Sequence, residues 1–147
     1  MIKRVFLAGG SGFVGTNFVD RFTSMPEVER ITVFDNFSSG TKSHLSHQKD
    51  HRVSVIEGDI RDLQALSGAM AGHDTVIHLA SNPDIARAMR EPTVDFDQGT
   101  ILTQNVLEAM RSGGVQRILY ASGSGIYGDT GNFEVSENHG PLEPIST

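Results

Sequence analysis

The chain has 147 residues, a length typical of one domain, and a formal net charge of −6 at neutral pH. It contains no cysteine, which excludes disulfides, thiolate catalysis and cysteine-based metal sites, and its 12 lysines and arginines form no stripe that would favour nucleic acid or an anionic membrane. No apolar run approaches the length of a signal-peptide core or a membrane span, so we expect a cytoplasmic protein without a membrane partner.

The chain opens with an apolar strand, expected over residues 3–8, that runs into a glycine-rich turn and a helix over 12–23. Two spacings fit the turn: G-x-G-x-x-G from residue 10, and a glycine at every third position from residue 9. In both, glycine permits a tight turn and lets backbone N–H groups approach a pyrophosphate at the start of the helix. Val14, Phe18 and Phe22 form the apolar stripe that we expect to face the sheet.

The second strand is expected over residues 31–35 and ends at Asp35, 20 positions beyond Gly15. A carboxylate at this distance binds the adenosine ribose in dinucleotide-binding folds. The order strand, glycine turn, helix, strand and acid therefore predicts a dinucleotide site rather than an ordinary turn residue. A flavin at the same turn fits less well, because Asp35 suits an adenosine ribose at a dinucleotide's distance.

The rest of the chain alternates strands with helices and loops, which predicts an α/β fold with an open, doubly wound parallel sheet and ligands at the carboxyl ends of its strands. The further strands are expected over 53–57, 75–80 and 117–121; the helices over 62–72, capped at its start by Asp62, and over 92–112; and the loops over 37–50, which also suits a short irregular helix, 82–91 and 128–147. We expect the last of these loops to be partly disordered.

Six short motifs occur in order: Gly9-Gly10-Ser11-Gly12-Phe13-Val14-Gly15, Asp35-Asn36-Phe37-Ser38-Ser39-Gly40, Gly58-Asp59-Ile60-Arg61-Asp62, His78-Leu79-Ala80, Gly99-Thr100 and Ile126-Tyr127-Gly128. With these motifs at these separations, the chain resembles the extended short-chain dehydrogenase/reductases, and within them the NAD-dependent epimerase/dehydratase group that acts on nucleotide sugars. The resemblance implies a Rossmann fold in which residues 1–147 form the NAD-binding domain, truncated before the C-terminal substrate-binding part.

The resemblance also implies which residues contact NAD. The backbone N–H groups of Phe13 and Val14 would meet the pyrophosphate, and Asp35 would bind the ribose and repel the 2′-phosphate of NADP. Asp59 and Ile60 would contact the adenine. The implied cofactor-binding residues are Gly9, Gly12, Phe13, Val14, Gly15, Asp35, Asn36, Ser38, Ser39, Gly40, Asp59, Ile60, Leu79, Ala80 and Ser81.

Three positions depart from the family pattern. The Tyr-x-x-x-Lys pair that supplies the general base in the family is absent, and no lysine follows Lys49. Gly123 occupies the place of the family's Ser or Thr, so Ser122 or Ser124 is left as the candidate catalytic hydroxyl, with Tyr127 and Ser124 as candidate substrate contacts. Phe96 replaces an asparagine of the family pattern.

We therefore expect the NAD-binding part of a longer nucleotide-sugar epimerase or dehydratase, which passes a hydride from a sugar hydroxyl to NAD and takes it back. The chain alone should bind without turnover, and its fifth strand and long helix should expose apolar surface and favour self-association. The alternative is a stand-alone NAD-binding module without catalysis. We expect no metal site, because His44, His47 and His51 are loosely spaced, and we expect His78 to be a buried imidazole with its hydrogen bonds satisfied.

Overall fold

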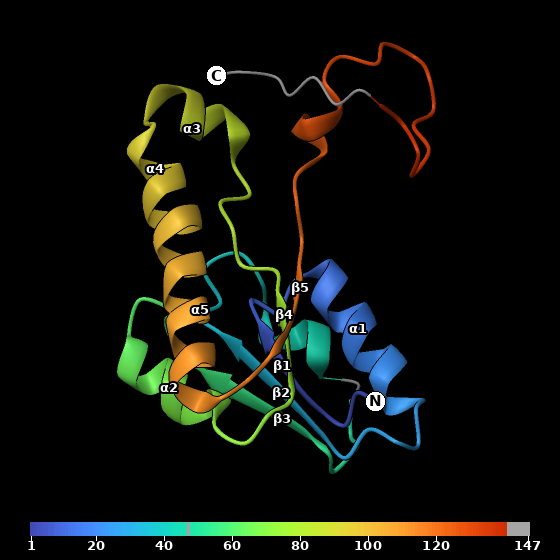
Figure 1. Cartoon of the computed structure of the whole chain (residues 1–147), viewed down its shortest axis with the longest axis vertical. Helices are drawn as coiled ribbons and strands as arrows, with labels where there is room; N and C mark the ends of the chain where they lie inside the picture. The colour runs from blue at the N-terminus through green and yellow to red at the C-terminus, as the bar shows by residue number, and fades with distance from the viewer. Residues whose placement is uncertain (47, 141–147) are drawn as a thin grey trace.

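The computed structural model describes residues 1–46 and 48–140, and its centre is a five-stranded parallel sheet (Figure 1). The strands lie in the order β3-β2-β1-β4-β5. Their bounds are β1 Arg4–Ala8, β2 Arg30–Asp35, β3 Val53–Glu57, β4 Thr75–His78 and β5 Arg117–Tyr120. The expected doubly wound α/β fold is confirmed.

The strand order reverses at β1, which pairs with β2 on one side and with β4 on the other. Ala8, near the end of β1, stands opposite Phe34 of β2 and His78 of β4. Because all five strands are parallel, their carboxyl ends lie at one edge of the sheet. A crevice for a ligand is expected beyond the strands that flank such a reversal.

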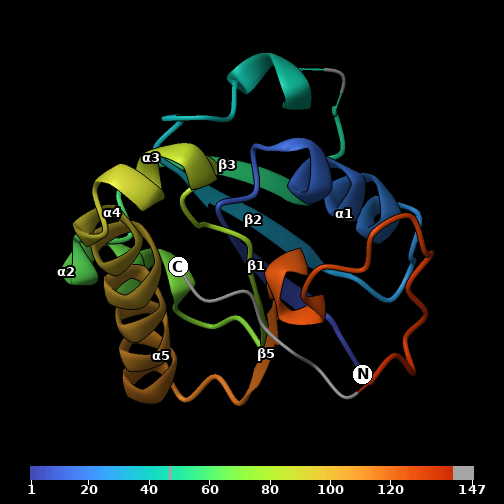
Figure 2. The ribbon, with the colours of Figure 1, turned by 90° about the horizontal axis from the view of Figure 1, so that it is seen from above.

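Helices cover both faces of the sheet. Helix α1 (Phe13–Thr23) lies on one face, and α2 (Leu63–Met70) and α5 (Ile101–Gly113) lie on the other (Figures 1 and 2). Side chains of β1 alternate accordingly: Val5 and Leu7 pack on the α1 side and Phe6 and Ala8 on the α2–α5 side, all fully buried. A strand buried on both faces explains the near-continuous apolar run in the sequence.

The buried stripe of α1 differs from the one expected. Its buried residues are Gly15, Thr16, Val19 and Phe22, whereas Val14 is 55% exposed. The difference follows from Gly15, which packs on the preceding turn and so rotates Val14 away from the sheet. Phe22 belongs to the stripe as expected.

The ends of two helices follow the capping signals in the sequence. The Asp62 side chain accepts a hydrogen bond from the Ala65 N–H at 3.0 Å, as expected for an N-cap of α2. Gly72, two residues past α2, and Gly114, at the end of α5, adopt φ values of +74° and +70°. Glycine accepts this left-handed conformation without the steric cost of a Cβ atom.

The segment between β4 and β5 is more helical than expected. Residues 82–91, expected to form a loop, contain helix α3 (Ile85–Arg90), which is capped by the Asp84 side chain. The helix expected over 92–112 consists of α4 (Thr93–Asp95), the π-helical turn η2 (Phe96–Thr100) and α5. Figure 1 shows α3 and α4 stacked beyond the sheet at the amino end of α5.

The two outer strands are more exposed than the central three. Val55 on β3 and Leu119 on β5 are each 44% exposed, and Tyr120 at the end of β5 is 58% exposed. Two 3₁₀ turns complete the fold, η1 (Lys42–Leu45) in the loop after β2 and η3 (Ser124–Tyr127) after β5. No helix in the described part of the chain has the length and apolar character needed to span a membrane.

Candidate dinucleotide site

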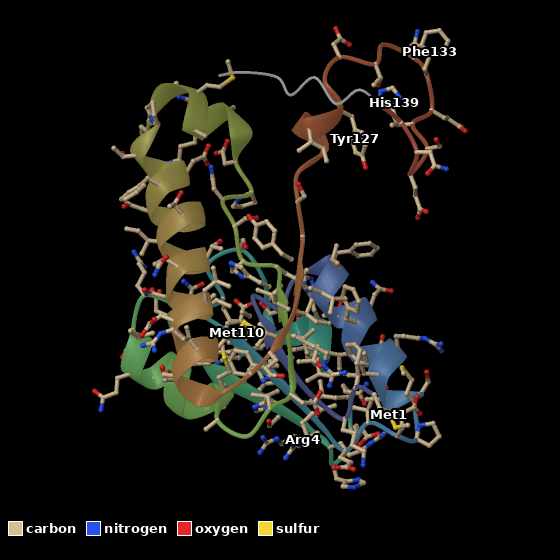
Figure 3. The ribbon with its side chains drawn as sticks, viewed as in Figure 1. Met1, Arg4, Met110, Tyr127, Phe133 and His139 are labelled. Atoms are coloured by element: carbon tan, nitrogen blue, oxygen red, sulfur yellow. The ribbon has the colours of Figure 1, made fainter. Side chains whose placement is uncertain are left out.

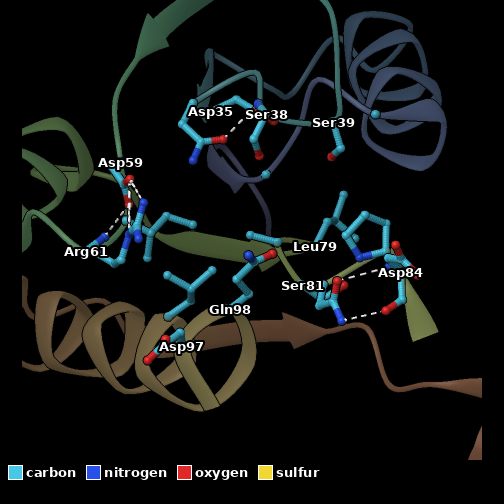
Figure 4. A pocket seen from close by; sticks show the side chains of 18 of the residues that line it. Asp35, Ser38, Ser39, Asp59, Arg61, Leu79, Ser81, Asp84, Asp97 and Gln98 are labelled. Carbon is cyan, nitrogen blue, oxygen red and sulfur yellow. Dashed lines mark hydrogen bonds and ion pairs between the residues drawn. The ribbon is translucent and has the colours of Figure 1, made fainter. Parts of the chain in front are cut away.

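A cavity of about 400 Å³ opens at the carboxyl ends of the strands, within the size range of small-molecule sites (Figure 4). Most of the residues expected to contact a cofactor line it. These are Gly9, Gly12, Asp35, Asn36, Ser38, Ser39, Asp59, Ile60, Leu79, Ala80 and Ser81. The lining also includes residues that were not among the expected cofactor contacts, namely Gly58, Arg61, Asn82, Pro83, Asp84, Arg87, Asp97, Gln98 and Leu102.

Three glycines of the first turn have separate structural roles. Gly9 has a φ of +80°, and a Cβ atom there would lie 2.5 Å from the backbone nitrogen of Ala80. A Cβ atom on Gly15 would overlap the carbonyl oxygen of Gly10, so Gly15 brings α1 against the turn. Gly12 lines the cavity, and a Cβ atom there would meet nothing within 4 Å. A Cβ atom on Gly10 would lie 2.8 Å from the Leu7 side chain, so both spacings found in the sequence consist of glycines with a structural role.

The amino end of α1 offers unpaired donors beside this turn. The amide groups of Phe13, Val14 and Gly15 have no acceptor among the described residues, and Gly12 provides no side-chain cap. The first turn contains no acidic residue. Unpaired N–H groups and the positive end of the helix dipole favour an anion at this position.

Asp35 lies at the end of β2 and is 9% exposed. Its Oδ2 accepts a hydrogen bond from the Ser11 N–H at 2.8 Å, and its Oδ1 accepts one from the Phe37 N–H at 2.8 Å. The carboxylate thus borders the cavity and also joins the glycine turn to the loop after β2. Each of its oxygens keeps a second lone pair for a ligand hydroxyl.

The loop after β2 folds back over the glycine turn. Gly40 does not line the cavity; it packs against Ser11 so closely that a Cβ atom would overlap the Ser11 hydroxyl. The Nδ1 atom of His44 lies 2.9 Å from the Ser11 carbonyl oxygen. Gly40 therefore shapes the site indirectly, by allowing the loop to approach the turn.

Asp59 and Arg61 form an ion pair in the lining of the cavity (Figure 4). Asp59 Oδ1 accepts from the Arg61 backbone N–H at 2.9 Å and from Arg61 Nε at 3.0 Å. The hydrogen bonds from Arg61 lower the pKa of Asp59 to about 2, so the carboxylate is ionised at neutral pH. Ile60 beside it is 6% exposed and supplies an apolar surface.

The segment after β4 forms the floor of the cavity. The Leu79 N–H donates to the Ala8 carbonyl at 2.8 Å, which holds the segment against β1. His78, the last residue of β4, is 1% exposed, as expected for a buried imidazole. Its Nε2 lies 3.1 Å from the Thr103 hydroxyl, but its Nδ1 has no hydrogen-bond partner among the described residues, so its hydrogen bonds are not all satisfied.

Tyr127, one of the candidate substrate contacts, is not among the described residues that line the cavity. Ser122 follows the end of β5, and Ser124 begins η3. The Tyr127 ring lies 6.1 Å from the His139 ring, in the segment that rises beyond the strand ends (Figure 3).

Among the described residues, no group of three or more His, Asp or Glu side chains is arranged to hold a metal ion. His44 is committed to the Ser11 carbonyl, and His51 lies beside Asp50. His47 and residues 141–147, the end of the expected tail, lie outside the described residues.

The residues that sequence reasoning missed come mostly from the segment 82–102. Arg87 lies on α3, and Asp97 and Gln98 lie on the π-helical turn η2. One signal was available: Asp84 stands three residues before Arg87, the spacing of a helix N-cap. Nothing in the sequence marks the π-helical turn that places Asp97 and Gln98 at the cavity.

Comparison with known proteins gives a consistent result. The sequence model of the "NAD dependent epimerase/dehydratase family" matches residues 5–147. A dTDP-glucose 4,6-dehydratase from Mycobacterium tuberculosis is 31% identical over 149 aligned positions, which include 97% of this chain and 44% of that protein. The chain thus spans less than half of the length of this relative.

Solved structures of similar proteins agree with the fold. A dTDP-glucose 4,6-dehydratase from Streptomyces venezuelae with NAD bound has a TM-score of 0.83 and 28% identity, over 96% of this chain and 45% of that one. A UDP-glucose 4-epimerase from Brucella ovis in complex with NAD has a TM-score of 0.81 and 25% identity, over 97% of this chain and 42% of that one.

Proposed function

The chain belongs to the NAD-dependent epimerase/dehydratase family, and we propose that it binds NAD in the cavity at the carboxyl ends of its strands. The observation that carries this proposal is the position of Gly12, which borders open space beside the unpaired amides of α1. A diphosphate needs both the room and the donors found there.

The remaining residues fit the other parts of the dinucleotide. Asp35 would accept hydrogen bonds from the adenosine ribose, and its charge would repel the 2′-phosphate of NADP. Asp59 would accept from the exocyclic amine of adenine, with Ile60 against the ring. Leu79, Ala80 and Ser81 would lie along the nicotinamide ribose. NAD, when bound, would supply a hydride acceptor for a sugar hydroxyl and return the hydride.

We further propose that these residues are the cofactor-binding part of an enzyme that epimerises or dehydrates a nucleotide sugar, and that the 147 residues alone bind without turnover. Neither tyrosine, Tyr120 or Tyr127, is followed by a lysine four positions later. The general base of the family pattern is therefore missing from this sequence. A stand-alone NAD-binding module is the second candidate, favoured by the same absence and by Gly123.

Calorimetric titration with NAD and NADP tests the cofactor. We expect NAD to bind more tightly by about tenfold or more, because Asp35 repels the additional phosphate. Gly12→Leu should abolish binding but keep the melting temperature, since its side chain enters open space. Gly68→Ala, on the exposed side of α2, is the control and should bind like the wild type. Equal binding of NAD by wild type and Gly12→Leu would disprove this site.

Incubation with NAD and UDP-glucose or dTDP-glucose tests turnover. The 147 residues alone should form no epimerised or dehydrated product and should accumulate no NADH. Product formation by the 147 residues would show that another group replaces the missing base.

A further inference from the structure

The cavity has few cations to offer a diphosphate. Its described lining contains the carboxylates of Asp35, Asp59, Asp84 and Asp97, against two guanidinium groups, those of Arg61 and Arg87. A diphosphate brings two further negative charges into this acidic surrounding. The amides of α1 supply partial positive charge only, so a cationic side chain would add a full positive charge opposite the anion.

Arg61 is committed to a partner within the protein. Its Nε lies 3.0 Å and 3.1 Å from the two carboxylate oxygens of Asp59, and its Nη2 also donates to that carboxylate. Asp97 adds a second negative charge near the same guanidinium. Arg61 would have to leave Asp59 in order to bind a phosphate.

Arg87 is held in place by its backbone and Nε, while its Nη1 and Nη2 atoms are available to donate hydrogen bonds to a ligand. Its backbone N–H donates to Asp84 Oδ1 at 2.9 Å, and its Nε donates to Glu91 Oε2 at 3.1 Å. Its Nη1 and Nη2 have no hydrogen-bond partner in the described ranges 1–46 and 48–140. Both side chains of the ion pair between Arg87 and Glu91 are about half exposed, so the pair is weak. It therefore presents little obstacle to a contact between Arg87 and a phosphate.

The base of α3 is organised by Asn82, which also lines the cavity. Its Oδ1 accepts from the Asp84 N–H at 3.0 Å, and its Nδ2 donates to the Asp84 carbonyl at 2.9 Å and to Asp95 Oδ1 at 3.0 Å. These bonds tie the start of α3 to α4. The helix that carries Arg87 is thus fixed at the cavity before any ligand binds.

We propose that Arg87 is a diphosphate-binding residue of this cavity, donating from Nη1 and Nη2 to phosphate oxygens. The inference rests on the proposed function, because it takes the diphosphate to be that of a dinucleotide or of a nucleotide sugar bound in the same cavity. A planar guanidinium suits such a bidentate contact better than an ammonium group does.

The test compares Arg87→Gln with Arg90→Gln, a matched variant on the same helix whose exposed side chain is not among the described residues that line the cavity. Titrations with NAD, adenosine, and UDP-glucose in the presence of NAD separate the two sources of diphosphate. If the diphosphate is that of the dinucleotide, Arg87→Gln should lower the affinity for NAD by about tenfold and leave the affinity for adenosine unchanged. If it is that of the nucleotide sugar, only the affinity for UDP-glucose should fall. In both cases, the affinity of Arg87→Lys for the affected ligand should lie between those of the wild type and of Arg87→Gln.

Three results would overturn the inference. The first is unchanged affinity of Arg87→Gln for both diphosphates, and the second is an equal loss for adenosine. The third is an equal loss in Arg90→Gln. Each of these leaves NAD binding by the wild type intact, whereas failure of the wild type to bind NAD would reject the proposed function itself. Thermal unfolding of each variant shows whether the fold is kept.

Discussion

The Asp35 carboxylate accepts a hydrogen bond from the backbone N–H of Ser11 at 2.8 Å, although the two residues are 24 positions apart. Ser11 is fully buried within the glycine turn, and Asp35 ends the neighbouring strand. The second carboxylate oxygen accepts from Phe37, whose φ is +57°. A residue expected from the sequence to bind only a ribose therefore also fixes the backbone on both sides of the site.

Asp35→Asn tests this structural role. The amide nitrogen of asparagine donates and cannot accept, so one of the two backbone N–H groups loses its acceptor. We expect the free energy of unfolding to fall by about 1–3 kcal/mol, the cost of an unsatisfied buried donor. Urea unfolding measures this change. Glu27→Gln also replaces a carboxylate by an amide, but at an exposed position, and should change the stability by less than about 0.5 kcal/mol. Equal stability of both variants would contradict the role of Asp35.

Gly15→Ala tests the packing of α1 on the glycine turn. The added Cβ atom would overlap the Gly10 carbonyl, so the helix must move, and we expect a loss of about 1–3 kcal/mol with weaker NAD binding. Gly68→Ala places the same methyl group in open space on α2 and should stabilise the protein by about 0.5–1 kcal/mol. Chemical denaturation of both variants checks the contrast, and a neutral Gly15→Ala would argue against close packing at this turn.

The strands and the strand-end residues of the site could be predicted from the sequence because both follow from burial. Val5 to Ala8 is an apolar run and Thr75 to His78 has an apolar centre; both are buried, and a parallel sheet brings the residues after them to one edge. Asp35 was placed at the cavity in this way, whereas Asp59 was expected there from the family resemblance.

The part of the site on α3 and η2 could not be predicted in this way. Helix α3 has six residues, and its Met89 is 69% exposed, so the helix leaves no long apolar stripe in the sequence. The π-helical turn η2 depends on hydrogen bonds within a continuous helix, which residue types do not specify. Arg87 and Gln98 reach the cavity only through these two features.

Stability should depend on pH near neutrality because of two buried histidines. Burial lowers the pKa of His78 and of His73 below the ordinary value. The unfolded chain then binds more protons than the folded one, so stability falls as pH drops below about 6.5. His78→Gln should reduce the slope of melting temperature against pH between about 5 and 7, with His73 supplying the remainder. An unchanged slope would contradict the contribution of His78. Asp59, with a pKa of about 2, titrates outside this window.

Self-association should occur through the outer edge of β5. This strand pairs with β4 on one side, and its other edge has no partner strand among the described residues. Leu119 and Tyr120 add exposed apolar surface there, and an apolar edge strand favours pairing with a second copy. Sedimentation of the wild type should therefore depend on concentration, and Leu119→Lys should shift the protein toward the monomer. Val55→Lys, at a side chain with the same 44% exposure on the opposite edge strand, should leave association unchanged. A wild type that sediments as a monomer at every concentration would reject this edge as an interface, because hydrogen bonds to water would then satisfy the backbone groups of the unpaired edge.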